Sequence, residues 1–123
     1  MAESSIQWSI LKWLETTGLL HWRANSGEVF VHGRRITLGP DGCPDVIVLV
    51  PPTGHFMGLE VKSAKGSVRS EQVAFAKRLN DCGASYYVVR TLDEARNAVA
   101  KEMGDQWKPT QAFGVKVLST STN

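Results

Sequence analysis

Three residues of this sequence have the types and the spacing needed for a metal-assisted hydrolytic site. Asp45 opens an apolar run at residues 45–50, and Glu60 and Lys62 close a second run at residues 56–62. Because residues i and i+2 of a strand point to the same face, Glu60 and Lys62 project together. An antiparallel hairpin between the two runs would bring Asp45 back beside them. Two carboxylates and an ammonium at one end of a sheet can hold a divalent metal and activate water against a phosphodiester.

A salt-bridged sheet edge is the simpler interpretation of these residues, since glutamate and lysine two positions apart are common on strands. That interpretation would leave Asp45 and Glu60 as two like charges held close together with one cation between them. Such a pair costs free energy unless a metal ion or a raised pKa relieves the repulsion. We therefore interpret Asp45, Glu60 and Lys62 as the centre of an active site.

The order of the surrounding motifs resembles the VRR-NUC family of the PD-(D/E)XK nucleases, which have a restriction-endonuclease-like core. The resemblance extends from about residue 6 to residue 99 and rests on an ordered set of four motifs, because a Glu-x-Lys tripeptide alone is a weak signal. The motifs are WRANSG at residues 22–27, GCPD at 42–45, GLEVK at 58–62 and GSVRSEQ at 66–72. The resemblance implies a metal-dependent endodeoxyribonuclease that uses Mg²⁺, with Mn²⁺ as a substitute.

Asp45 and Glu60 are the candidate metal ligands, because Mg²⁺ takes carboxylate oxygens and keeps several waters. The resemblance implies the backbone carbonyl of Val61 as a third ligand. Lys62 would orient or deprotonate the attacking water, or stabilise the developing negative charge. By the family pattern, Gln72 lies beside the Glu-x-Lys strand, where its amide could hold Lys62 or a metal-bound water. A tether between a helix and the sheet is the alternative role for Gln72.

Further site residues come from the resemblance. In nucleases of this type a glutamate of the first helix reaches the metal site, and Glu15 occupies the matching place; an ordinary surface glutamate is the alternative. Arg23, Asn25 and Ser26 belong to the family's N-terminal signature and are expected to contact phosphate, although residues 25–27 could equally form a simple turn. Weaker candidates for phosphate contacts are Arg34, Arg35, Lys65 and Arg69.

The elements that position these residues begin with a helix predicted over residues 6–19, capped by Ser4 or Ser5 and ending near Gly18. At about 100° per residue, its residues form two stripes on opposite sides. One stripe should pack on the sheet, and the other needs a second partner. The first stripe comprises Ile6, Ile10, Trp13, Leu14 and Thr17, and the second comprises Trp8, Leu11 and Glu15.

The rest of the chain predicts an α/β fold with a mixed central sheet of about five strands flanked by helices. A hairpin is expected at residues 28–38, turning at 32–34. It is followed by strands at 45–50, 56–62 and 85–90, by helices at 70–82 and 92–103, and by a short edge strand at 115–118. A Thr91–Glu94 capping box marks the start of the last helix. We expect a single domain over residues 1–118 and a flexible tail at 119–123.

Length and composition fit one globular domain with one modest core. The formal net charge of +2 permits nucleic-acid binding without demanding it. Cys43 and Cys82 are far apart and fit no zinc spacing, so we expect reduced thiols in a cytoplasmic protein. The sequence has no apolar stretch of membrane-spanning length and no signal-peptide pattern. We expect neither membrane association nor a nucleotide cofactor.

We therefore expect hydrolysis of structured or branched DNA, such as four-way junctions, that is recognised by its shape. One alternative is a non-catalytic nucleic-acid-binding module on the same fold, although a site no longer in use would be expected to lose Asp45, Glu60 or Lys62. The other alternative is an assembly protein that binds its partner through the first helix.

Resolution of a four-way junction needs two matched cuts, so we expect a homodimer whose two sites share the two-fold symmetry of the junction. Trp8 and Leu11 on the second stripe form the expected interface, because large apolar groups exposed together usually mark a contact surface. The alternative is that the C-terminal segment covers this stripe, since Trp107 and Phe113 also need burial.

Overall fold

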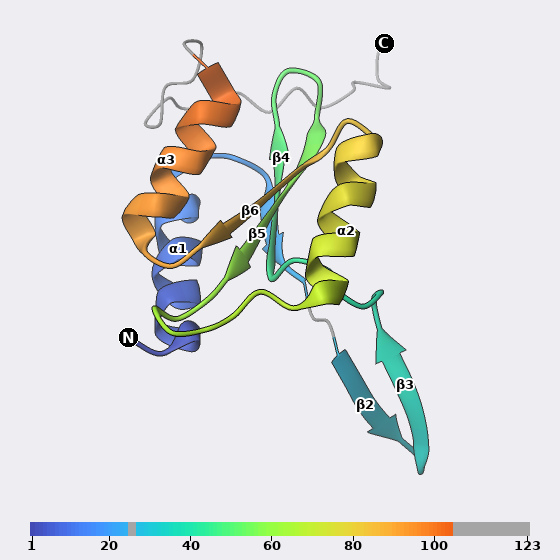
Figure 1. Ribbon diagram of the computed structural model, residues 1–123. Coiled ribbons are helices and arrows are strands. Elements are labelled where there is room, and N and C mark those ends of the chain that lie inside the picture. Colours follow the sequence, from blue (N-terminus) through green and yellow to red (C-terminus); the bar gives the residue numbers. More distant parts are fainter. Residues whose placement is uncertain (25–26, 105–123) are drawn as a thin grey trace, which may run out of the picture.

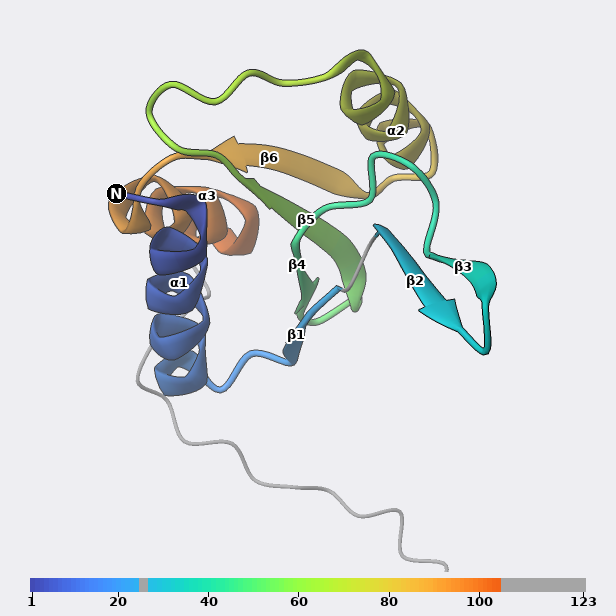
Figure 2. The ribbon, with the colours of Figure 1, turned by 90° about the horizontal axis from the view of Figure 1, so that it is seen from below.

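The computed structural model describes residues 1–24 and 27–104. Its elements are α1 (Glu3–Thr17), β1 (His21–Arg23), β2 (Gly27–Val31), β3 (Arg34–Leu38), β4 (Val46–Val50), β5 (His55–Val61), α2 (Ser70–Asp81), β6 (Ser85–Val89) and α3 (Leu92–Met103). A four-stranded sheet lies between two layers of helices, with α1 and α3 on one face and α2 on the other (Figure 1, Figure 2). None of the described helices is long and apolar enough to cross a membrane.

The sheet is mixed, with the strand order β1-β4-β5-β6. β4 runs antiparallel to both β1 and β5, whereas β6 is parallel to β5. A parallel pair needs a crossover, and α2 supplies it between β5 and β6. The predicted mixed α/β architecture is confirmed, with four strands in the sheet that the described residues form. The short strand β1 was not predicted, and the strand expected at 115–118, the tail at 119–123, Trp107 and Phe113 lie outside the described residues.

The hydrophobic core lies between the sheet and the layer formed by α1 and α3. Alternate residues of β4 and β5 point into it, among them Val48 and Met57, which are fully buried. Most of the first predicted stripe of α1 is buried, and Trp13 packs against the core while partly buried. The buried residues of the helix are Ile6, Ile10, Leu14 and Thr17.

The start of α1 differs from the prediction, whereas its end lies near Gly18 as predicted. The helix begins at Glu3 with Ala2 as its N-cap, so the prediction of Ser4 or Ser5 as the cap is wrong, because both lie inside the first turn. Gly18 ends the helix with a φ of 77°, in the left-handed region that glycine adopts most easily. The earlier start places Glu3 in the first turn of the helix.

β2 and β3 form a hairpin that is separate from the central sheet. His32 and Gly33 make its two-residue turn, and both have a positive φ, 52° and 75°, as a type I′ turn requires. The hairpin projects from the end of the sheet at which β4 begins and β5 ends (Figure 1, Figure 2). We refer to residues 27–38 as the arm.

Candidate active site

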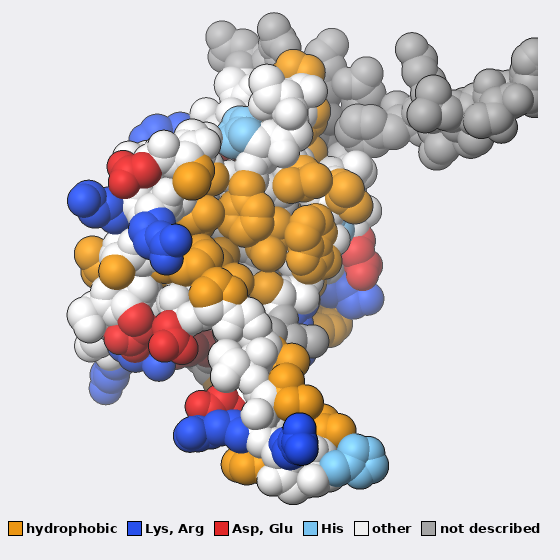
Figure 3. All heavy atoms as spheres, turned by 90° about the vertical axis from the view of Figure 1, so that its right-hand side faces the viewer, with side chains coloured by type: hydrophobic (Ala, Val, Ile, Leu, Met, Phe, Trp, Pro, Cys, Tyr) orange, Lys and Arg blue, Asp and Glu red, His pale blue; other side chains and the backbone are white. Residues whose placement is uncertain are grey.

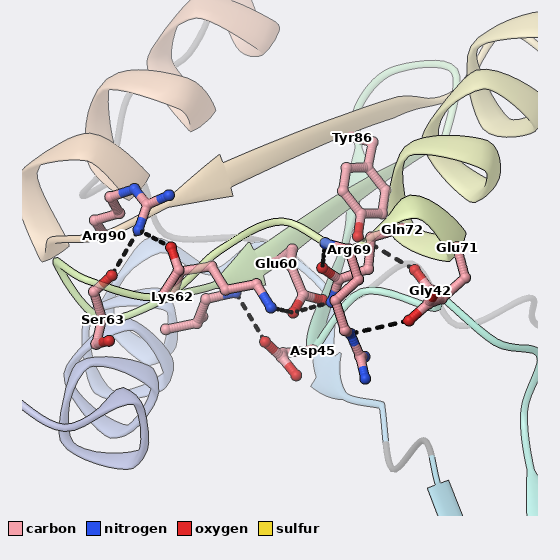
Figure 4. A network of polar contacts seen from close by, with 12 residues as sticks. Gly42, Asp45, Glu60, Lys62, Ser63, Arg69, Glu71, Gln72, Tyr86 and Arg90 are labelled. Atoms are coloured by element: carbon pink, nitrogen blue, oxygen red, sulfur yellow. Dashed lines mark hydrogen bonds and ion pairs between the residues drawn. The ribbon is translucent and has the colours of Figure 1, made fainter.

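Asp45, Glu60 and Lys62 lie together at the end of the sheet where β4 begins and β5 ends (Figure 4). Because β4 and β5 pair in antiparallel register, the residue before β4 returns beside the end of β5. Oδ2 of Asp45 accepts a hydrogen bond of 2.8 Å from the backbone N–H of Val61. The structure therefore brings the three residues at the centre of the predicted site to one place.

Glu60 is almost completely buried, with 4% of its surface exposed. Its Oε2 accepts a hydrogen bond of 2.9 Å from Nε2 of Gln72 and lies 3.7 Å from Nζ of Lys62. The other oxygen, Oε1, is buried and has no hydrogen-bond partner among the described residues. A buried carboxylate oxygen without a partner costs free energy, and a cation bound there would offset that cost.

Burial raises the pKa of both carboxyl groups of the pair, and the pKa of Glu60 reaches about 7. The nearby charge of Asp45 is the second cause at Glu60, whereas the ammonium of Lys62 acts in the opposite direction. At Asp45, burial outweighs the hydrogen bond from Val61, which by itself lowers the pKa. At pH values below about 7 the pair therefore retains a proton. A divalent cation beside it would favour the state in which both groups are ionised.

Gln72 connects this pair to the start of α2. The side chain is 2% exposed, and its Oε1 accepts a hydrogen bond of 3.0 Å from the backbone N–H of Arg69. Its Nε2 donates to Glu60, so the structure places the amide on Glu60 rather than on Lys62. A glutamine held at both ends fixes the orientation of the Glu60 carboxylate.

Two glycines allow the turn before Asp45 to pack tightly. Gly42 has a φ of 85°, and a Cβ at this position would overlap the backbone carbonyl oxygen of Glu71 at the start of α2. A Cβ on Gly58 would lie 2.5 Å from Cγ of Pro44. The turn is therefore held between β5 and α2, and this close packing positions the Asp45 side chain.

α1 contributes a carboxylate to this region, but it is not the predicted one. A Cβ added to Gly66 would lie 3.3 Å from Oε2 of Glu3, and after burial the charge of Glu3 is among the causes that raise the pKa of Asp45. Glu15 lies roughly three turns, or about 18 Å, further along the helix. Its side chain is 63% exposed and 3.9 Å from Nζ of Lys12. The structure does not bring Glu15 to the cluster, because α1 presents its N-terminal end there.

Arg90 fixes the loop that follows Lys62 (Figure 4). Its Nη1 donates hydrogen bonds of 2.6 Å to the carbonyl of Ser63 and 2.7 Å to the carbonyl of Gly66. Because Arg90 directly follows β6, it connects the neighbouring strand to this loop. Neither Arg90 nor Glu3 was predicted from the sequence; the helix was expected to begin at residue 6, which left Glu3 outside it.

The described candidates for phosphate contact are all exposed. They are Arg23 on β1, Lys65 and Arg69 between β5 and α2, and Arg34 and Arg35 on β3. Lys65 and Arg69 lie in the loop that begins at Lys62, directly after β5. Asn25 and Ser26 lie outside the described residues.

A cation in this cluster would depend on the two carboxylates and on the backbone. Within residues 1–24 and 27–104, no group of three or more His, Cys, Asp or Glu side chains could hold a metal ion. The N–H and C=O of one strand residue face the same neighbouring strand, so the Val61 carbonyl faces the side on which its N–H meets Asp45. The unpaired Oε1 of Glu60 and the raised pKa values of the pair fit a cation at this position.

A protein-family model and a solved structure both match this chain. The family model described as the VRR-NUC domain matches residues 2–93. The chain is also similar to a solved structure described as "VRR_NUC domain", with a TM-score of 0.57 and 24% sequence identity over 79% of this chain and 92% of that chain. This structural likeness shows a shared fold. No curated protein matches the chain.

The raised pKa of Glu60 predicts how the stability of the metal-free protein depends on pH. The folded state holds a proton that the unfolded state releases near 4.5, so stability should fall as the pH rises from about 4.5 to about 7. Glu60→Gln removes the ionisable group and retains an acceptor for Gln72. In chelator we expect this variant to melt at a higher temperature than the wild type at pH 8, and the difference to vanish near pH 4.5.

Thermal unfolding followed by circular dichroism measures this difference. Glu15→Gln is the matched control, since its side chain is exposed and lies at the far end of α1. A difference between Glu60→Gln and the wild type that stays constant from pH 4.5 to pH 8 would contradict the account.

Proposed function

The chain belongs to the VRR-NUC domain family, and from this membership we propose that it is a metal-dependent endodeoxyribonuclease acting on structured or branched DNA. The family is one of nuclease-type domains. The observation that carries the proposal is the partly buried Asp45 beside the buried Glu60, whose Oε1 has no hydrogen-bond partner among the described residues, with the buried Lys62 next to them. This arrangement combines anionic ligands for a cation with a positive charge for a phosphate.

In this proposal, Asp45, Glu60 and the backbone carbonyl of Val61 hold one Mg²⁺, for which Mn²⁺ can substitute. When bound, the ion would neutralise charge on the scissile phosphate and lower the pKa of a nearby water. Oε1 of Glu60 can serve as a ligand of the ion, because Gln72 and Lys62 contact only Oε2 and Oε1 has no hydrogen-bond partner among the described residues. The Val61 N–H holds Asp45 through Oδ2, which orients the carboxylate without neutralising it.

Among the described residues, Lys62 is the cation that pairs with Glu60 in this proposal. It is 8% exposed, and its Nζ lies 3.7 Å from Glu60. From this position the ammonium can orient the attacking water, or it can donate to a phosphate oxygen as negative charge develops. Water then adds to phosphorus, the bond to the leaving oxygen breaks, and that oxygen takes up a proton.

The proposed substrate is DNA with a distorted or branched structure. Support comes from the exposed basic residues in the loop between β5 and α2 and on the arm. Phosphate contacts of this kind position the protein without reading bases. We also propose that two copies act together, because a four-way junction has two strands to cut. In the expected interface on α1, Trp8 is 62% exposed whereas Leu11 packs against the core, so only Trp8 remains fully available.

Cleavage of plasmid, flap and four-way junction DNA tests the proposal. We expect cutting with Mg²⁺ or Mn²⁺, none in excess chelator, and faster cutting of the branched substrates than of duplex. Ca²⁺ should support binding better than cutting, because it activates water less well. Full activity in excess chelator would contradict the mechanism, and DNA binding without cleavage under any of these ions would indicate the non-catalytic module instead.

Substitutions within the cluster serve as the controls for this assay. Asp45→Asn, Glu60→Gln and Lys62→Ala should each lower the cleavage rate on the order of a hundredfold or more. DNA binding should persist in the two carboxylate variants, because repulsion from phosphate falls. A wild-type rate for Lys62→Ala would remove its proposed role.

Glu3 and Glu15 provide a matched pair of substitutions on one helix. Glu3→Gln should lower cleavage by on the order of tenfold, the scale of a group that tunes a site from beside it. Glu15→Gln should leave the rate unchanged, because this side chain lies at the far end of α1. The two single-turnover rates are compared at saturating Mg²⁺; the reverse order would restore the assignment of Glu15 to the site.

A further inference from the structure

The arm is placed to meet DNA that occupies the proposed active site. It projects from the same end of the sheet as the cluster (Figure 1, Figure 2). β3 leads through one loop into Asp45, so the position of the arm is tied to that of the cluster. A substrate that reached Asp45 and Lys62 from outside this end of the sheet would therefore lie close to the arm.

Both faces of the arm expose apolar side chains beside an arginine. On one face Phe30 pairs across the strands with Arg35, and on the other Val31 pairs with Arg34. Phe30 is 75% exposed, the highest value after Met1 among the large hydrophobic residues that the structure describes. Figure 3 shows apolar, basic and histidine side chains gathered on this projection at the bottom of the view. An isolated two-stranded hairpin is only marginally stable in water, so contact with a bound partner would stabilise the arm.

The charges of the arm fit a polyanion. Arg34 and Arg35 outnumber Glu28, which is already paired with Arg35. His32 occupies the turn at the tip. A two-stranded ribbon is narrow enough to enter a DNA groove, and apolar side chains are commonly inserted between base steps by proteins that bend DNA. Arginine beside an aromatic ring is also the combination that stacks on unpaired bases.

We propose that the arm is a DNA-binding ribbon that enters the branch point of the substrate, where Phe30 stacks on a base exposed by the branch. This inference rests on the proposed function and specifies its substrate: DNA with an unpaired or poorly stacked base near the cut. Arg34 and Arg35 contact the flanking phosphates. The arm thereby distinguishes branched DNA from continuous duplex, in which the bases stay stacked.

A second copy of the chain suits the arm less well than DNA. A stable protein interface buries about 800 Å² on each partner, and one face of this short hairpin offers only a few apolar side chains. Arm residues carry apolar and basic groups on both faces, which suits contact with the two walls of a groove.

Binding measured without cleavage tests the proposal. In an Asp45→Asn background with Ca²⁺, we expect Phe30→Ala to weaken binding to a four-way junction by about tenfold or more, the effect of losing one stacked base. Binding to continuous duplex should change much less. 2-Aminopurine placed at the branch should change in fluorescence on binding of the parent protein, and this change should be lost in Phe30→Ala. Leu20→Ala, which removes a residue 63% exposed near the other end of the sheet, should leave both signals unchanged.

Two outcomes would overturn the role of the arm. The first is that Phe30→Ala binds the junction with the same affinity as the parent protein and gives the same change in 2-aminopurine fluorescence. The second is a lower mass by light scattering for Phe30→Ala than for the parent, which would assign the arm to an interface between copies. Neither bears on catalysis, because cleavage of DNA by the wild type in Mg²⁺ is measured separately. Loss of junction binding in Phe30→Ala together with no cleavage by the wild type would support the arm and reject the nuclease.

Discussion

Asp45, which is partly buried, and Glu60, which is buried, lie together at one end of the sheet, and much of the surrounding structure serves to stabilise them there. The antiparallel register of β4 and β5 creates the contact, and burial raises the pKa of both groups. The Val61 N–H, the Gln72 amide and the Lys62 ammonium each stabilise one carboxylate oxygen. These contacts leave one oxygen of Glu60 without a described partner. The contacts within the fold therefore balance the negative charge of the two carboxylates only in part.

A second glutamate, Glu102, is partly buried and shows what a structural carboxylate looks like in this chain. Oε1 of Glu102 on α3 accepts hydrogen bonds from His55 and Ser85, and its Oε2 accepts one of 2.6 Å from Tyr87. These contacts tie α3 to β5 and β6 near the end of the sheet opposite the cluster, and both oxygens are used. Glu60 differs because its Oε1 has no hydrogen-bond partner among the described residues. The contrast supports a binding role for Glu60 rather than a purely structural one.

Local patterns predicted those parts of the site that depend on strand geometry. Two adjacent apolar runs joined by a turn were sufficient to place Asp45 beside Glu60, because one antiparallel hairpin determines that contact. The structure does not bring Glu15 to the cluster, since α1 carries a carboxylate near each end and only tertiary packing decides that Glu3, not Glu15, lies at this end of the sheet. Arg90 was missed for a similar reason. Its partners in the loop after β5 lie 24 and 27 positions away, and no local pattern marks such a contact.

Titration of the protein with Mn²⁺, followed by electron paramagnetic resonance, tests most directly whether the carboxylate pair is a cation site. The account predicts saturable binding at pH 8 and weaker binding at pH 6, where Glu60, with a pKa of about 7, is mostly protonated. Binding should be lost in the Asp45→Asn, Glu60→Gln double variant and retained in Glu15→Gln. Equal Mn²⁺ affinity in the double variant and the wild type would contradict the central claim.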